Sequence, residues 1–339
     1  MALREITIIS RRCTPNLPRR SAAVLDMPVY LRNAGGLLVV MVLVGSPACS
    51  TSNFKVGAHS YSAVKYLPET NGDALRVFSS EGSATAINLP FRLGRVVFAP
   101  DRRSLYGTNA EGPGLSKVEF NLVRLSPVPG TTGFFIKSFA VSGRQDKVVI
   151  SGRRSDPDGG GCGVFEVLIP AGDARQVLNS DCRYRWAWDS LSLSPDGEQA
   201  VAEVGSNTDH DLHLELIDLA HGITKPISSE FWVGVWSPDG KWIAALGNGN
   251  HNLVLIDAHD FSKRRKLGST SRIKPEWSPD SRYLLLWDHP LRCGIGIDLD
   301  PPATLQALDV ESGERSMIRS SECKVVFGST GWVSNDIAR

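Results

Sequence analysis

The chain repeats a short phrase in which an aromatic or apolar residue precedes Ser-Pro-Asp-Gly and an apolar run follows. Pro presets φ, Asp tolerates the bridge region and Gly supplies the positive φ that comes next, so the phrase predicts a tight turn between two strands. Legible copies begin at Phe98, Leu193, Trp236 and Trp277, and a degraded copy spans Phe139 to Ile150. The recurrence constrains the chain to an array of similar hairpins.

Two copies depart from the phrase at the Gly position, where Arg102 and Ser281 stand instead. A side chain with a Cβ is strained at positive φ, whereas Gly is not. We therefore expect these two turns either to hold a strained residue or to adopt a different turn type.

The spacing of the copies indicates the architecture. Successive copies begin 41, 54, 43 and 41 residues apart, close to the period of roughly 40–45 residues of a four-stranded propeller blade. We interpret the Gly-rich stretch 156–161 in the long interval as a loop insertion. A second phrase, an alternating strand followed by an acidic or Gly turn, lies between the turns and predicts the outer hairpin of each blade. Its copies are Leu214–Gly222, Leu253–Asp257, Leu305–Gly313, Val164–Val167, Ala74–Phe78 and, most loosely, Ser116–Leu125.

The two ends of the repeat region are expected to meet. Residues 61–67 read as a strand with no turn phrase before it, and residues 331–336 offer an inner strand at the C-terminus. Joining them closes the ring and leaves only short, protected edges. The sequence thus predicts an all-β fold, a six-bladed β-propeller of four-stranded antiparallel blades closed by its C-terminal strand.

These phrases resemble the WD40-like repeat of TolB-type six-bladed β-propellers, and the resemblance covers roughly residues 61–336. TolB carries a further α/β domain ahead of its propeller, for which this chain shows no pattern. The resemblance implies the fold, and it does not carry a TolB partner over to this chain.

The N-terminal region is typical of an exported protein. Residues 35–45 form an apolar run preceded by Arg32 and followed by small residues, which is signal-peptide organisation; the run is shorter than the roughly 20 residues that span a bilayer. We expect a start at Met27, a signal peptide over 27–48, a polar tether over 49–60 and the propeller over 61–339, with residues 1–26 a start-site artefact or an extension. Cys49 follows the small residues as in a bacterial lipobox, so we expect lipidation there; simple secretion with the same cut after Ala48 is the alternative.

The remaining cysteines also favour export. Beyond Cys13 and Cys49 there are four, and they occupy equivalent places in two predicted blades. Each pair falls on connections that emerge on one face of a propeller, so we predict the disulfides Cys162–Cys182 and Cys293–Cys323, each worth about 3 kcal/mol. Four buried free thiols are the alternative.

The composition and the motifs exclude some classes of function. The formal net charge is +1 with no basic stripe, so we expect no nucleic acid as a partner. Nucleophile-elbow, His-Glu-x-x-His and phosphate-loop motifs are absent from the sequence, and no cofactor is indicated. His210, His251 and His289 follow the second strand of consecutive blades, but their loop-like flanks favour solvated histidines over a metal site.

The candidate binding residues are predicted at the mouth of the central channel. Trp186, Trp188 and Trp232 open inner strands, and Arg185 and Lys274 stand near the corresponding entries. Such a rim suits a peptide or an anionic group, although the rings would equally fill a tapered core. We therefore expect a monomeric, non-catalytic scaffold, exported to the periplasm or cell surface, that binds an envelope protein or peptide and touches the membrane only through its lipid. The alternative is a propeller-type enzyme, a lactonase or polysaccharide lyase, with a channel metal near Asp189 and Glu276.

Overall fold

The chain divides into two units, residues 1–49 and 50–339. The computed structural model describes residues 61–67, 73–78, 84–155, 161–180, 191–205, 212–247, 252–270, 274–288, 303–321 and 330–334. The predicted signal peptide, the tether and Cys49 lie outside these residues. In the described ranges every regular element is a strand, and none of these residues forms a helix that could cross a membrane.

Along the chain the strands fall into groups of four, except that the first group has three strands and takes its fourth, β24, from the C-terminal end. The first groups are β1 (Tyr61–Leu67), β2 (Asp73–Phe78) and β3 (Ala84–Leu89); β4 (Leu93–Phe98), β5 (Ser104–Asn109), β6 (Leu115–Glu119) and β7 (Arg124–Pro127); and β8 (Phe134–Val141), β9 (Lys147–Arg154), β10 (Cys162–Leu168) and β11 (Ala174–Ser180). The next are β12 (Ser192–Leu193), β13 (Gln199–Val204), β14 (His213–Asp218) and β15 (Ile223–Ser228); and β16 (Phe231–Trp236), β17 (Trp242–Gly247), β18 (Asn252–Asp257) and β19 (Arg264–Ser269). The last are β20 (Glu276–Trp277), β21 (Tyr283–Asp288), β22 (Ala303–Asp309), β23 (Arg315–Ser321) and β24 (Thr330–Ser334).

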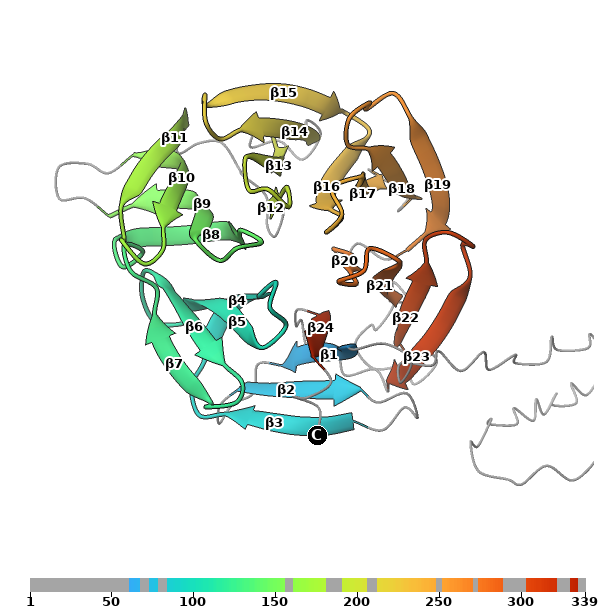
Figure 1. Cartoon of the computed structure of the whole chain (residues 1–339), viewed down its shortest axis with the longest axis horizontal. Helices are drawn as coiled ribbons and strands as arrows, with labels where there is room; N and C mark the ends of the chain where they lie inside the picture. The colour runs from blue at the N-terminus through green and yellow to red at the C-terminus, as the bar shows by residue number, and fades with distance from the viewer. Residues whose placement is uncertain are drawn as a thin grey trace, which may run out of the picture. The chain divides into compact units, whose positions relative to one another are not determined.

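These strands form six four-stranded antiparallel sheets arranged around a common axis, with β4, β8, β12, β16, β20 and β24 innermost (Figure 1). The predicted all-β propeller of four-stranded antiparallel blades is therefore confirmed. The predicted closure is also confirmed, because β24 pairs with β1 in the register Ala63↔Trp332. Trp332 is fully buried, so the junction between the two ends of the described chain is part of the core.

The repeated turn has the predicted geometry. In the copies at Ser194, Ser237 and Ser278 the serine hydroxyl donates to the following Asp at 2.5–2.6 Å. The same hydroxyl accepts the backbone N–H of the residue five positions on, at 2.8–2.9 Å. Gly197 and Gly240 have φ of 75° and 76°, the left-handed region in which Gly carries no steric cost.

The strain expected at the non-glycine copies is present. Ser281 has φ of 59° and Arg102 has φ of 60°, so both adopt the same turn and accept the left-handed conformation. The physical reason lies in the backbone ladder. In the Ser278 turn the Ser278 N–H donates to the Tyr283 carbonyl at 2.8 Å, and the Ser281 N–H donates to the Ser278 carbonyl at 2.9 Å. The glycine copy at Ser237 makes the same two bonds.

The degraded copy is displaced from the position that the sequence predicted. The prediction aligned Phe139 with Trp236, but the turn serine is Ser142, whose N–H donates to the Lys147 carbonyl at 3.0 Å. Val141 is thus the equivalent of Trp236. The acidic residue has moved along the turn, because the Ser142 hydroxyl donates to Asp146 at 2.6 Å. Gln145 takes the Gly position with φ of 57°.

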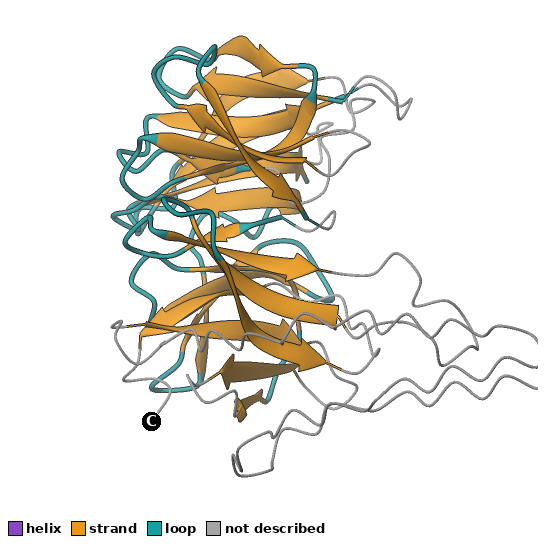
Figure 2. Ribbon diagram, turned by 90° about the vertical axis from the view of Figure 1, so that its right-hand side faces the viewer, coloured by secondary structure: helices purple, strands orange, loops and turns teal. Residues whose placement is uncertain are grey.

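The turns that join first to second strands lie against those that join third to fourth strands. In the β4–β7 blade Phe120 N–H donates to the Arg103 carbonyl at 3.0 Å, and in the β12–β15 blade Leu219 N–H donates to the Glu198 carbonyl at 3.1 Å. Figure 2 shows these turns, in teal, gathered on one side of the sheets. This side of the propeller is therefore built from short, hydrogen-bonded turns.

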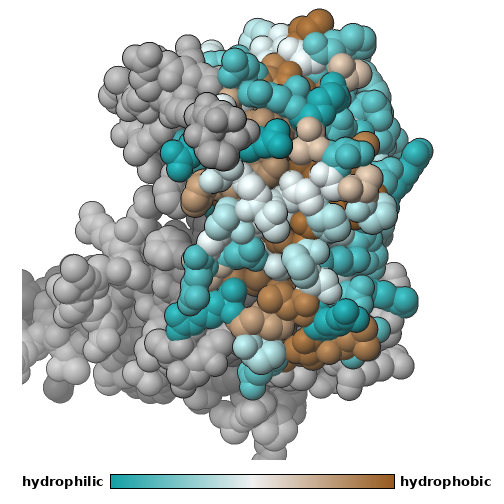
Figure 3. All heavy atoms as spheres, turned by 90° about the vertical axis from the view of Figure 1, so that its left-hand side faces the viewer, coloured by the Kyte–Doolittle hydropathy of each residue, from teal (hydrophilic) through white to brown (hydrophobic). Residues whose placement is uncertain are grey.

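The hydrophobic core lies between adjacent blades. One cluster joins Val235, Leu246 and Leu255 of the β16–β19 blade to Trp277 and Leu284 of the next. Another joins Tyr106 of the β4–β7 blade to Phe134 and Phe165 of the β8–β11 blade. The outer surface of these last two blades mixes hydrophilic and apolar residues (Figure 3). Its exposed apolar side chains include Leu122, Val123 and Leu125.

Candidate functional site around the propeller axis

Two of the five predicted rim residues lie among the described residues, namely Trp232 and Lys274. Arg185, Trp186 and Trp188 lie outside them, as do His210, His251, His289 and Asp189. Cys162 begins β10, but Cys182, Cys293 and Cys323 lie outside the described residues, so both disulfide pairings stay predictions.

The inner strands are linked to one another around the axis. The links are short and use side chains of one inner strand and the backbone of the next. They are Trp332 Nε1 to Glu276 O at 3.4 Å, Trp277 Nε1 to Val235 O at 3.0 Å, Trp236 N to Ser192 Oγ at 3.0 Å, Leu191 N to Ser138 Oγ at 3.2 Å, and the Arg95 guanidinium to Lys137 O. These bonds hold the inner ends of the blades in place and so fix the side chains near the axis.

Lys274 belongs to this set of links. It lies just before β20, and its ammonium group donates to the Leu191 carbonyl at 3.4 Å. Leu191 precedes β12, so the lysine joins the entries of two non-adjacent inner strands. The side chain is half-buried, which places a positive charge among the inner strands.

Trp232 sits at an irregularity in β16. The register with β17 shifts between Phe231 and Val233, leaving Trp232 outside the regular pairing. A bulge of this kind redirects a side chain, and bulges are common beside functional sites. Trp232 is half-buried and packs against the core cluster that contains Val233 and Trp277. It therefore has both a packed part and an exposed part.

Glu276 brings a carboxylate to the same region. Burial raises the pKa of Glu276, while the positive charges of Lys274 and Arg102 act in the opposite direction. Arg102 comes from the β4–β5 turn and Lys274 from the entry to β20, so the charges converge from different blades. We call Arg102, Lys274 and Glu276 the axial charge cluster. Among the described residues it holds two cations and one carboxylate.

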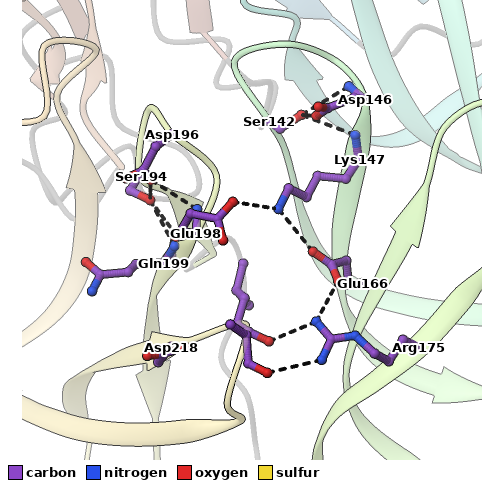
Figure 4. A network of polar contacts seen from close by, with 12 residues as sticks. Ser142, Asp146, Lys147, Glu166, Arg175, Ser194, Asp196, Glu198, Gln199 and Asp218 are labelled. Carbon is purple, nitrogen blue, oxygen red and sulfur yellow. Dashed lines mark hydrogen bonds and ion pairs between the residues drawn. The ribbon is translucent and has the colours of Figure 1, made fainter.

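A second polar network joins the β8–β11 and β12–β15 blades (Figure 4). Glu166 accepts from Lys147 at 3.1 Å and from Arg175 at 2.7 Å. Arg175 also donates to the Leu219 carbonyl at 2.9 Å. Burial raises the pKa of Glu166, but the bonds from Arg175 and Lys147 outweigh it and hold the pKa below its ordinary value. Since every cation here is engaged with the protein, the network stabilises the interface between blades.

Glu203 is a buried acid that the sequence did not single out. It lies on β13 with no exposed surface, and burial raises its pKa from 4.5 to about 8. Among the described residues no group of three or more His, Cys, Asp and Glu side chains could hold a metal ion.

The axial arrangement of four-stranded blades defines the chain as a β-propeller, and comparison with solved structures supports this class. No family model and no curated protein matches the sequence. TolB from Acinetobacter baumannii is similar over 80% of this chain, with a TM-score of 0.60 and 14% identity. A chain of a nidogen–laminin complex is similar over 80% of this chain and 98% of its own length, with a TM-score of 0.58 and 8% identity.

A TolB candidate from Agrobacterium tumefaciens is also similar, over 77% of this chain and 88% of its own, with a TM-score of 0.52 and 17% identity. The chain spans 66% of the length of the Acinetobacter TolB. At such identities these likenesses concern the fold alone. The chain thus has the propeller fold that these TolB structures share.

Proposed function

We propose that this protein is an exported, lipid-anchored and non-catalytic β-propeller that binds a protein or peptide in the cell envelope, in the periplasm or at the cell surface. Its blades are the six four-stranded sheets, with β24 completing the blade of β1–β3. The likeness of fold to TolB structures supports a propeller scaffold. The N-terminal pattern of an apolar run followed by Cys49 supports export and lipidation.

The observation that carries the binding proposal is the half-buried Trp232, which packs against the core cluster of Trp277, the residue next to Glu276 of the axial charge cluster. Lys274 and Arg102 both act electrostatically on Glu276, and Trp232 is half-buried. Tryptophan and arginine are among the side chains that most often dominate binding energies at protein interfaces. A peptide carrying an acidic residue next to an apolar one would match both features.

Capture of a partner by crosslinking tests this site. A photo-crosslinking residue at Trp232 should capture a defined envelope protein, whereas the same residue at Ile223, exposed on the outer strand β15, should not. Trp186→Ala combined with Trp232→Ala, or Lys274→Gln alone, should lower capture about tenfold or more. Lys266→Gln, on the outer strand β19, is the matched charge control. Equal capture from positions 232 and 223 would place the binding surface elsewhere.

The export and lipid attachment of the protein are tested separately. Cys49→Ser should remove the lipid mass from the mature protein and release it from the membrane fraction, because a lipid chain is what retains it there. A mature wild-type chain of unmodified mass would favour simple secretion instead. Alkylation of the native protein with and without reductant tests the disulfides: four alkylatable thiols without reductant would refute the Cys162–Cys182 and Cys293–Cys323 pairs.

A further inference from the structure

A pocket lies between the β4–β7 and β8–β11 blades, away from the axial charge cluster. Its volume is about 410 Å³, which falls in the range of small-molecule sites. One wall is formed by the end of β5 and the turn after it, from Thr108 to Gly114, and the other by residues of β8, β9 and β10. Because the walls come from two blades, the pocket exists only in the assembled propeller.

A bulge in β8 delivers a lysine to this pocket. The register between β8 and β9 shifts between Ile136 and Ser138, so Lys137 stands outside the regular ladder. Its carbonyl accepts instead from the Arg95 guanidinium of β4, which fixes the backbone at the bulge. The Lys137 side chain is exposed and lines the pocket. Bulges re-aim side chains in this way beside functional sites.

An exposed aromatic ring and a second cation complete the same wall. Phe135 is 45% exposed and lines the pocket. The Arg153 guanidinium lies 5.0 Å from the centroid of its ring, and the two residues are directly opposite each other across β8 and β9. Gly152 lets the β9 backbone lie close to the β8 backbone, because a Cβ at position 152 would lie 2.3 Å from the Phe135 carbonyl oxygen.

The pocket carries positive charge that the described part of the protein does not neutralise. No carboxylate is among the residues that line it. Within the described ranges neither Lys137 nor Arg153 forms an ion pair. Two cations that pair with no carboxylate among the described residues, next to an exposed ring, attract a ligand that is both anionic and apolar, since the ring supplies contact area and the cations supply charge-assisted hydrogen bonds.

We propose that this inter-blade pocket binds a carboxylate attached to an aromatic body. The carboxylate contacts Lys137 and Arg153, and the aromatic body packs against Phe135. Arg153 serves both parts, because a planar guanidinium stacks on a ring and also pairs with a carboxylate. The pocket is separate from the axial charge cluster, so a test of this proposal does not depend on the proposed scaffold function. The same chemistry is offered by a free aromatic acid and by a peptide that ends in an aromatic residue.

Titration of the purified full chain with matched acids and amides tests the proposal. N-acetyl-phenylalanine should bind with a Kd of about 1 mM or tighter, and its neutral amide about tenfold more weakly, because the amide cannot pair with the cations. A pentapeptide ending in Phe, with a free or an amidated C-terminus, forms the second arm. Tighter binding of the free-acid peptide than of N-acetyl-phenylalanine identifies a polypeptide terminus as the source, and equal or weaker binding identifies a free acid.

Variants of the pocket separate charge from packing. Lys137→Gln and Arg153→Gln should each weaken binding of the acid about tenfold and leave binding of the amide unchanged. Phe135→Ala should weaken binding of acid and amide alike. Arg124→Gln, an exposed arginine on β7 that does not line the pocket, is the control and should bind like the wild type. The proposal is overturned if acid and amide bind equally, if Arg124→Gln weakens binding as much as Arg153→Gln, or if no arm shows saturable binding.

Discussion

Replacing Glu166 by Gln tests the network between the β8–β11 and β12–β15 blades. The Glu166 side chain is 11% exposed and contacts Lys147, which is 14% exposed, and Arg175, which is 52% exposed. Gln keeps the shape and one acceptor oxygen but removes the negative charge. Lys147 would then retain only Glu198, at 3.5 Å and 63% exposed, so a nearly buried ammonium would lose its main partner.

The expected cost follows from the two bonds that lose their charge. A hydrogen bond to a charged group contributes about 1.5–3 kcal/mol and a neutral one about 0.5–1.5 kcal/mol. The exposure of Arg175 screens its share. We expect Glu166→Gln to lower the free energy of unfolding by about 2 kcal/mol at neutral pH, measured by urea denaturation. Glu198→Gln should cost under about 0.5 kcal/mol, because that carboxylate is an exposed partner of the same lysine.

The effect should depend on pH with a definite sign. The pKa of Glu166 is lowered in the folded protein, so its stabilisation is fully present above the unfolded value of about 4.5 and is lost as the pH falls through the folded pKa. The difference between wild type and Glu166→Gln should therefore shrink on acidification below about pH 4. Equal destabilisation by Glu166→Gln and Glu198→Gln, or a difference that persists unchanged in acid, would refute this account of the interface.

Three further changes probe other parts of the fold. Burial raises the pKa of Glu203 from 4.5 to about 8, so its contribution to stability is present below pH 4.5 and lost as the pH rises through 8. Glu203→Gln should therefore lose less stability with rising pH and be more stable than wild type at pH 8 by up to about 5 kcal/mol. Parallel curves of stability against pH for the two proteins would contradict this. Trp332→Ala should cost about 3–5 kcal/mol in denaturant unfolding, and Trp332→Phe much less, because the ring is fully buried where β24 joins β1. Gly222→Ala should lower the melting temperature more than Gly240→Ala, although both glycines have positive φ. The new Cβ would lie 2.5 Å from the Val177 carbonyl oxygen at Gly222 but 3.6 Å from Pro195 at Gly240. Equal losses would show that φ strain alone decides.

The propeller could be predicted because its turn chemistry is local. Ser, Pro, Asp and Gly form the turn within six residues, so the phrase at Trp236 predicts a hairpin independently of the rest of the chain. The same reasoning failed by two residues at Phe139, because Asp146 caps Ser142 from a later position than Asp239 caps Ser237. A pattern fixed to one order of residues cannot recognise a turn that closes the same hydrogen bonds in another order.

The charged groups near the axis and in the inter-blade pocket could be predicted only in part. Lys274 was found because it stands beside a recognisable strand entry. Arg102 was noticed for its turn position, and its electrostatic contact with Glu276 joins blades that are more than a hundred residues apart in sequence. Lys137 lies in a bulge, which shifts its side chain out of the alternation that sequence reading assumes. Such contacts depend on how blades pack together, and no single repeat contains that information.

The three copies of the repeated turn that hold a non-glycine residue at positive φ, at Arg102, Gln145 and Ser281, share a property that explains why Gly is absent from them. At Gln145 the amide oxygen accepts from the Tyr106 hydroxyl of the preceding blade at 3.2 Å, and at Ser281 the hydroxyl accepts from Asp239 N–H of the preceding blade at 2.9 Å. A left-handed residue costs about 1–2 kcal/mol, and a hydrogen bond returns about 0.5–1.5 kcal/mol, so the two effects nearly cancel. Arg102 has the same backbone strain, and its charge acts on Glu276 across blades. In all three turns, local strain is therefore offset by an interaction with another blade. A glycine at any of these positions would relieve the strain and lose the interaction.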